Sequence, residues 1–225
     1  LTCLAATWDP EMGLLYGKNV GEEARYRRKS VLLGPGVNIY RTPLNGRNFE
    51  YMGEDPYLAS QMCVPYIQGL QSNGVACCVK HYALNDQEEF RNEVDVKVSD
   101  RALYEIYLPA FKAAVQQGKA WSIMGSYNLY RGIHVAHNPY LINNILKKNN
   151  VNQALIITFV IEANDRQKSL ILDRIHTLFA KDKKKNPLAI DLAHAMVDSV
   201  VTEANHLENL VSGDISQEDL FCEIK

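Results

Sequence analysis

The stretch Gly74-Val75-Ala76-Cys77-Cys78-Val79-Lys80-His81-Tyr82 decides the fold class of this chain. Its first six residues are small or apolar and predict a strand buried on both faces, which is typical of a parallel sheet. A cation, an imidazole and a phenol follow at once, where we expect the strand to reach the surface. In α/β folds, loops at the carboxyl ends of the strands converge on one opening. The stretch therefore predicts a polar site at the end of a buried strand.

Two further apolar runs also lead to polar groups. Residues 31–33 (Val-Leu-Leu) lead through residues 34–40 toward Arg47, and residues 121–124 (Trp-Ser-Ile-Met) lead to residues 126–128 (Ser-Tyr-Asn). Because the carboxyl ends of parallel strands share one edge of a sheet, the three runs predict a common pocket for these groups.

Helix signals separate the apolar runs. The dipeptide Asp55-Pro56 begins one predicted helix, because aspartate caps a helix and proline fits its first turn. Ser99-Asp100 caps a second over residues 101–117, and a third covers residues 139–148. A fourth apolar run over residues 154–160 predicts another buried strand. Helices and strands in alternation favour an α/β fold built from parallel βα units.

Composition divides the chain near residue 150. All 12 tyrosines and twelve of the 13 glycines lie before this point, so a part rich in turns precedes a part that favours helices. We expect a first unit over residues 1–160 and a helical tail over residues 161–225. The two tail helices are predicted over residues 164–181 and 187–211. Their apolar face either packs on the first unit or binds a partner helix.

Charge and composition disfavour several classes of protein. The formal net charge of −2 gives no basic field for nucleic acid or an anionic membrane. No apolar stretch approaches the ~20 residues of a membrane-spanning helix. Five cysteines, an odd number, argue against a complete disulfide framework, and Cys77 and Cys78 are predicted to be small core residues. Because the chain begins at Leu1, we expect it to be a fragment or a processed form. The sequence therefore predicts no cellular compartment.

Six short motifs follow one another between residues 5 and 148. They are Ala5-Ala6-Thr7-Trp8-Asp9-Pro10, Leu33-Gly34-Pro35-Gly36-Val37-Asn38-Ile39, Gly46-Arg47-Asn48-Phe49-Glu50 followed by Gly53-Glu54-Asp55-Pro56-Tyr57, Val79-Lys80-His81-Tyr82, Asn85-Asp86-Gln87-Glu88, and Ser126-Tyr127-Asn128. In this order they resemble the N-terminal barrel domain of glycoside hydrolase family 3, the β-glucosidase and β-xylosidase type. The resemblance implies a partial (β/α)8 TIM-barrel-like domain that holds several of the middle units.

The resemblance also implies roles for individual residues. Arg47, Lys80 and His81 would bind hydroxyl groups of the sugar in the −1 subsite, and Tyr127 would lie near the anomeric centre. A guanidinium suits vicinal hydroxyls because its donors are fixed in pairs, and a neutral imidazole both donates and accepts. Residues 86–88 (Asp86, Gln87, Glu88) would hold the loop after His81 in place. The implied partner is a β-linked glucoside or related sugar.

The chain departs from the family pattern at the catalytic nucleophile. Retaining glycosidases use two carboxyl groups roughly 5–5.5 Å apart. In the family, the nucleophile is an aspartate in a Ser-Asp-Trp-like segment, and counting from Lys148 on the family spacing places Phe159 there. Phenylalanine cannot attack carbon, so we expect little or no turnover. A slipped register would instead bring Glu162 or Asp165 to this position.

Three interpretations remain open at this point. The chain is an impaired or truncated β-glucosidase-like hydrolase, a non-catalytic sugar-binding module, or an interaction protein that works through its tail. The resemblance implies an acid/base from a second domain, which we do not expect within these residues. Open sheet edges of a partial barrel would be covered by the tail or by a second copy of the chain. We expect no cofactor and no metal, with His134 and His137 as loop residues.

Overall fold

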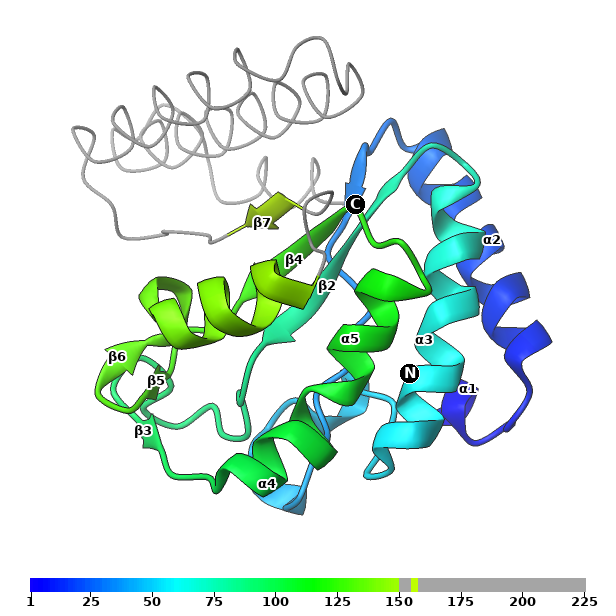
Figure 1. Ribbon diagram of the computed structural model, residues 1–225. Helices are drawn as coiled ribbons and strands as arrows, with labels where there is room; N and C mark the ends of the chain where they lie inside the picture. The colour runs from blue at the N-terminus through cyan, green and yellow to red at the C-terminus, as the bar shows by residue number, and fades with distance from the viewer. Residues whose placement is uncertain (150–154, 158–225) are drawn as a thin grey trace, which may run out of the picture. The chain divides into compact units, whose positions relative to one another are not determined.

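The computed structural model of the chain describes residues 1–149 and 155–157 (Figure 1). Phe159 and the predicted tail over residues 161–225, including both of its helices, lie outside the described residues. The chain divides into two compact units, Leu1–Phe159 and Val160–Lys225, and every described element belongs to the first.

A four-stranded parallel sheet forms the centre of the described part. Its strands follow one another in the order of the chain: β1 (Val31–Leu32), β2 (Ala76–Tyr82), β4 (Ser122–Gly125) and β7 (Leu155–Ile157). The register places Val31 opposite Ala76, and Ser122 between Cys78 on one side and Leu155 on the other. The four predicted apolar runs therefore pair in parallel.

Strand β2 is longer than its apolar run. It continues to Tyr82, and both His81 and Tyr82 are buried, so the prediction that the strand reaches the surface at these residues is wrong. Neighbouring segments satisfy the backbone on both sides: the Lys80 N–H donates to the Pro35 carbonyl at 3.0 Å, and the Ser126 N–H donates to the Tyr82 carbonyl at 2.7 Å. These bonds extend the backbone pairing of β2 through the residues that carry the polar side chains.

Helices α2 (Pro10–Tyr26), α3 (Pro56–Gln71) and α5 (Pro109–Gln116) lie along one side of the sheet (Figure 1). The predicted start of α3 is confirmed, because Asp55 Oδ1 accepts hydrogen bonds from the N–H groups of Tyr57 and Leu58. Helix α2 begins in the same way at Asp9, although sequence analysis assigned no helix there. A short helix α1 (Thr2–Ala5) precedes it.

The predicted helix over residues 101–117 is interrupted. It consists of α4 (Asp100–Ala102), a π-helical segment η3 (Leu103–Tyr107) and α5. Pro109 has no N–H to donate, so the regular helical hydrogen bonding is broken there. In the residue before it, the Leu108 N–H donates to the Leu103 carbonyl five residues earlier at 3.0 Å, which is the π-helical pattern. The third predicted helix is likewise π-helical over Tyr140–Leu146 (η5) and ends in a 3₁₀ turn, Lys147–Asn149 (η6).

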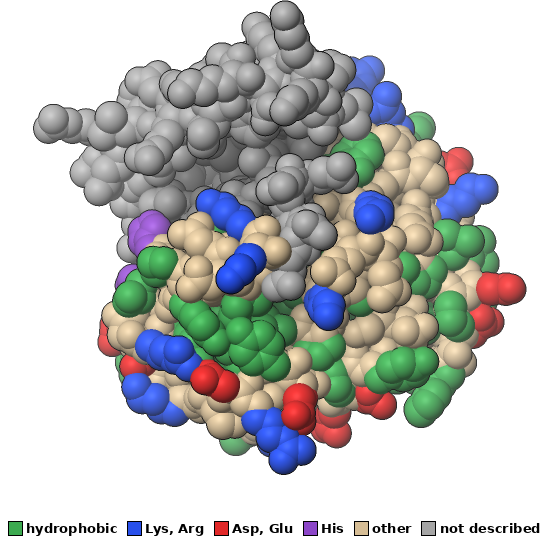
Figure 2. Space-filling view, in the orientation of Figure 1, with side chains coloured by type: hydrophobic (Ala, Val, Ile, Leu, Met, Phe, Trp, Pro, Cys, Tyr) green, Lys and Arg blue, Asp and Glu red, His purple; other side chains and the backbone are tan. Residues whose placement is uncertain are grey.

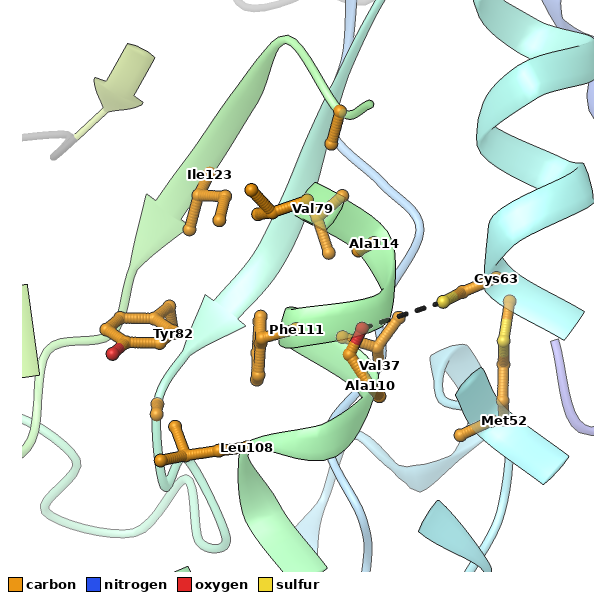
Figure 3. Packing of buried hydrophobic residues seen from close by; sticks show 14 of the residues in the cluster. Val37, Met52, Cys63, Val79, Tyr82, Leu108, Ala110, Phe111, Ala114 and Ile123 are labelled. Atoms are coloured by element: carbon orange, nitrogen blue, oxygen red, sulfur yellow. Dashed lines mark hydrogen bonds between the residues drawn. The ribbon is translucent and has the colours of Figure 1, made fainter. Parts of the chain in front are cut away.

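The hydrophobic core lies between the sheet and these helices (Figure 3). The rings of Tyr82 on β2 and Phe111 on α5 meet edge to face with centroids 5.2 Å apart. Cys63 on α3 packs against the Ala110 carbonyl, with its Sγ 3.7 Å from the oxygen. Cys77 and Cys78 are fully buried, which confirms their prediction as core residues.

Glycines bring α2 and α3 into close contact. Gly13, Gly17 and Gly21 are buried and recur every four residues, so they lie on one face of α2. A Cβ added at Gly17 would lie 2.1 Å from the Tyr66 carbonyl oxygen, and one added at Gly69 of α3 would lie 2.3 Å from the Leu14 carbonyl oxygen. The two helix backbones therefore approach too closely for side chains between them.

A small second sheet is formed by residues that follow β2 and β4 in the chain. Strand β3 (Asp95–Val96) pairs in parallel with β5 (Leu129–Tyr130), which pairs antiparallel with β6 (Ile133–His134). His134 and His137 were predicted to be loop residues, but they lie in β6 and in the 3₁₀ helix η4 (Val135–His137), where they are exposed. Within the described residues, no group of three or more His, Cys, Asp or Glu side chains could hold a metal ion.

Charges of both signs are interspersed on the face of the molecule in Figure 2. In the described part of the chain, no helix is both long enough and apolar enough to cross a bilayer.

Candidate functional site

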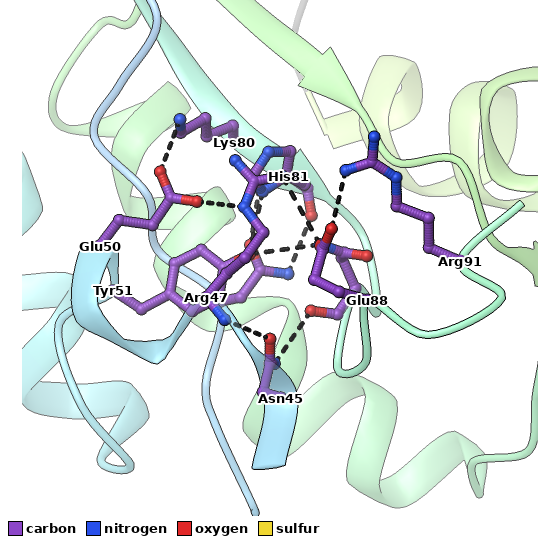
Figure 4. Close-up of polar contacts among 10 residues, drawn as sticks. Asn45, Arg47, Glu50, Tyr51, Lys80, His81, Glu88 and Arg91 are labelled. Carbon is purple, nitrogen blue, oxygen red and sulfur yellow. Dashed lines mark hydrogen bonds and ion pairs between the residues drawn. The ribbon is translucent and has the colours of Figure 1, made fainter. Parts of the chain in front are cut away.

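The segment over residues 45–51 brings polar side chains against the carboxyl end of β2. Asn45 holds it in place: its Oδ1 accepts from the Arg47 N–H at 3.2 Å, and its Nδ2 donates to the Asn85 carbonyl at 3.3 Å. The Asn45 carbonyl accepts from the Glu88 N–H at 3.1 Å. Asn45 thus ties together the two segments that follow β1 and β2 (Figure 4).

Glu50 lies between the two candidate sugar-binding cations. Its Oε2 accepts from Lys80 Nζ at 2.7 Å, and its Oε1 accepts from Arg47 Nε. All three side chains are largely covered, with 13% of Lys80, 18% of Glu50 and 23% of Arg47 exposed. Burial opposes ionisation of Glu50, but the hydrogen bonds and charges of Lys80 and Arg47 outweigh it and hold the pKa of Glu50 below its usual value.

A second carboxylate, Glu88, connects Arg47 to another cation. Glu88 Oε1 lies 3.6 Å from Arg47 Nη1 and accepts from Asn85 Nδ2 at 2.9 Å, while Glu88 Oε2 accepts from Arg91 at 2.7 Å. The Arg91 guanidinium lies over the ring of Tyr127, 4.9 Å from its centroid. This contact links Tyr127 to the same polar cluster as Arg47, Lys80 and His81.

His81 is buried and fixed through both its ring and its backbone. Its Nδ1 lies 3.0 Å from the Tyr51 hydroxyl, which in turn accepts from Asn85 Nδ2 at 3.4 Å. This arrangement favours donation of the Tyr51 proton to Nδ1 and leaves the ring proton on Nε2. Burial, together with the charges of Arg47 and Lys80, lowers the pKa of His81 to about 3, so the ring is neutral at physiological pH.

The backbone of His81 is held by one buried side chain, Asn38. Asn38 Oδ1 accepts from the His81 N–H at 2.6 Å, and Asn38 Nδ2 donates to the His81 carbonyl at 3.0 Å. We expect Asn38→Ala to lower the free energy of unfolding by about 3 kcal/mol, because two buried backbone groups lose their partner. Urea unfolding measures this. Asn19→Ala serves as the control, because it removes an exposed contact to the Leu15 carbonyl and should change stability little. Equal losses in both variants would contradict the expectation.

The three predicted loop-holding residues have different surroundings. Glu88 joins the cluster as described, whereas Gln87 is exposed and donates to the Glu89 carbonyl at 2.8 Å within its own loop. Asp86 is mostly covered, and its Oδ1 has no hydrogen-bond partner among the residues that the structure describes. Burial raises the pKa of Asp86 to about 7 against the opposing charge of Arg41.

Three members of the cluster were not predicted as site residues: Glu50, Tyr51 and Arg91. Glu50 stands in the same motif as Arg47, but its second partner, Lys80, belongs to strand β2. Tyr51 and Arg91 had no signal of their own except their position next to motifs. A separate surface cavity of about 350 Å³ contains none of these side chains and is lined by Val96, Lys97, Val98, Ser99, Tyr130 and Arg131.

Comparison with known families decides the family of the chain. The family model described as the glycosyl hydrolase family 3 N terminal domain matches residues 1–163. The chain belongs to glycoside hydrolase family 3. Its solved structural neighbours in this family are TIM-barrel-like, in agreement with the α/β architecture and parallel strands of the described part.

Several family 3 proteins are similar to this chain. The β-glucosidase BoGH3A of Bacteroides ovatus is 74% identical over 147 residues, which cover 65% of this chain and 20% of that protein. An exo-α-(1→6)-L-arabinopyranosidase of Bifidobacterium breve is 46% identical over 144 residues, which cover 64% of this chain and 19% of that protein. The chain thus spans about a fifth of the length of these relatives.

A solved family 3 structure extends the similarity to most of the chain. It is β-glucosidase 3B of Thermotoga neapolitana in complex with α-D-glucose, which is 32% identical with a TM-score of 0.70. The match covers 96% of this chain and 29% of that one.

Proposed function

We propose that this chain forms the sugar-binding part of a β-glucosidase-like glycoside hydrolase. Arg47, Lys80 and His81 would bind the hydroxyl groups of a β-linked glucoside, and Tyr127 would lie beside the reacting carbon. The observation that carries the proposal is the meeting of a guanidinium, an ammonium and a neutral imidazole at the end of β2 in a family 3 chain.

The hydrogen bonds of the cluster leave donors available for a sugar. Arg47 uses Nε for Glu50 and directs Nη1 toward Glu88, so among the described contacts its Nη2 is left for a ligand. Lys80 gives one of its three N–H groups to Glu50. His81 keeps Nε2 as a donor when Nδ1 accepts from Tyr51. Hydroxyl groups both donate and accept, which suits a set of donors close to carboxylates.

We propose further that this chain is impaired in hydrolysis. Phe159 falls on the nucleophile position in the family spacing. The two carboxylates of the cluster, Glu50 and Glu88, are held in ion pairs. Glu50, whose pKa is lowered, would be a poor general acid. Burial raises the pKa of Asp86, but its Oδ1 makes no hydrogen bond to any described residue of the cluster.

Glucose titration of the full chain, followed by NMR, tests the sugar site. We expect the parent to bind glucose with a Kd on the order of millimolar, because few contacts offset the ordering of the ligand. Arg47→Ala should weaken binding about tenfold or more through loss of a charged donor. Arg101→Ala, which removes an exposed pair with Glu105, should bind like the parent.

Two results would contradict these proposals separately. Identical titrations for the parent and Arg47→Ala would remove the sugar-binding role of Arg47. Hydrolysis of an aryl β-glucoside at the rate of an intact family member would remove the proposed impairment, whereas binding without turnover describes a non-catalytic sugar-binding module.

A further inference from the structure

We propose that Glu50 is a positioning residue that aims the remaining donors of Arg47 and Lys80 at a single sugar. This inference rests on the proposed function, since it concerns how the same site holds its ligand. It assigns a role to a carboxylate that would touch the two binding cations rather than the substrate.

The geometry places one carboxylate oxygen on each cation. Glu50 Oε2 lies 2.7 Å from Lys80 Nζ, and Oε1 accepts from Arg47 Nε (Figure 4). Both cations carry long side chains with many rotamers, and each one is attached to a different segment. A carboxylate that accepts from both fixes the distance between them, so their free N–H groups are held in one arrangement.

The charges of the cluster make this carboxylate necessary for close approach of the cations. Arg47 and Lys80 are both positive and both lie close enough to His81 to lower its pKa. Without a negative group between them, the two cations would repel each other in a largely covered site. Glu50 removes that repulsion and still leaves donors on each cation for a ligand.

The fold of the segment over residues 48–51 does not depend on the Glu50 carboxylate. The Tyr51 N–H donates to the Asn48 carbonyl at 3.1 Å, and Asn48 Nδ2 donates to the Thr42 carbonyl at 2.7 Å. The Thr2 hydroxyl donates to the Tyr51 carbonyl at 3.2 Å. A change confined to the Glu50 carboxylate therefore leaves the anchors of the segment in place.

Replacing Glu50 by glutamine separates the positioning of the two cations from the space that the side chain fills. Glu50→Gln keeps the size of the side chain but offers one oxygen and one NH₂ group in place of two oxygens. It can accept from one cation only, and its NH₂ group then faces the other. Glu105→Gln is the matched control, because Glu105 also pairs with an arginine, Arg101, but at an exposed helix site.

The experiment titrates the full chain with glucose and with its monodeoxy analogues, followed by NMR. We expect Glu50→Gln to bind glucose about tenfold more weakly than the parent. Its melting temperature should fall, because Arg47 and Lys80 lose the negative charge between them, so the choice among sugar analogues, and not stability, reports positioning. The parent should discriminate against at least one deoxy analogue, and Glu50→Gln should lose that discrimination. In a Lys80→Ala background, Glu50→Gln should reduce the affinity for glucose less, because one of the two cations that Glu50 contacts is absent.

Each outcome bears on one of the two proposals. Equal affinity and equal discrimination in the parent and Glu50→Gln would overturn the positioning role. If the parent binds no sugar, the proposed function fails, and the Arg47 Nε–H resonance then tests Glu50 alone. A separate, slowly exchanging resonance in the parent that disappears in Glu50→Gln but not in Glu105→Gln supports the positioning of Arg47. An unchanged resonance in all three proteins overturns it.

Discussion

Gly17→Ala is expected to lower the free energy of unfolding by about 3 kcal/mol or more, the largest effect of an alanine at any glycine that the structure describes. The added Cβ would lie 2.1 Å from the Tyr66 carbonyl oxygen, well inside van der Waals contact. That oxygen belongs to the backbone of α3, so it cannot move away by a change of rotamer. The helices must separate, and core contacts around α3 are lost with them. Urea unfolding followed by circular dichroism measures the loss.

The same helix supplies graded controls. A Cβ at Gly21 would lie 2.7 Å from the Leu70 carbonyl oxygen, and one at Gly13 would lie 3.1 Å from the Met62 carbonyl oxygen. We therefore expect the order of destabilisation to be Gly17, then Gly21, then Gly13. Lys18→Ala is exposed and should be nearly neutral. Stabilisation by Gly17→Ala, the usual effect of alanine inside a helix, would show that α2 and α3 do not pack in this way.

Asp86→Asn is expected to stabilise the chain at pH 8 by about 3 kcal/mol and to have little effect near pH 4. Burial raises the pKa of Asp86 to about 7 in the folded chain, against a usual value of 3.8. Between these two values the folded state holds a proton that the unfolded state has released. Stability from this group therefore falls as the pH rises from about 4 to 7. Asparagine removes this loss because it carries no charge.

His81 contributes a pH dependence of the opposite sign. Its pKa is about 3 in the folded chain, against 6.5 for the free side chain, so the unfolded state binds the proton first. Stability from His81 is present above pH 6.5 and is lost as the pH falls toward 3. In the parent the two groups oppose each other between about pH 4 and 6.5. Asp86→Asn should expose the His81 slope and become steadily more stable as the pH rises.

Denaturant unfolding at several values of pH tests this pair of effects. Glu105→Gln, at an exposed site, controls for the loss of one negative charge and should follow the parent at every pH. A difference between the parent and Asp86→Asn that shrinks as the pH rises would contradict the buried, protonated state of Asp86.

Some helices could be predicted from the sequence and others could not, for physical reasons. The start of α3 could be, because Asp55 and Pro56 act locally on the first turn. Helix α2 begins with the same signal, Asp9-Pro10, but its buried face consists of Gly13, Gly17, Gly21 and Ala24. These residues form no apolar stripe, so the usual periodic signal of a helix is absent. Helix α2 is recognised only from its close packing against α3, which the sequence of α2 alone does not indicate.

Only those residues of the site that stand in recognisable sequence motifs could be predicted. Arg47, Lys80 and His81 could be named from motifs, and the structure brings them together, while their roles in binding remain a prediction. Glu50 could not be singled out, because its proposed role also depends on Lys80, which comes near it only after folding. Residues 80–82 were expected beyond the strand because polar side chains usually mark its end; backbone pairing with Pro35 and Ser126 extends it.

The order of the strands in the parallel sheet has a consequence for biosynthesis. Because β1, β2 and β4 neighbour each other in the order in which they are translated, each new unit can dock on one that has already left the ribosome. Among the described strands of this sheet, each one but the last pairs with the strand of the next unit to be translated. Sequential docking of this kind keeps the exposed strand edge of the growing protein short-lived during synthesis.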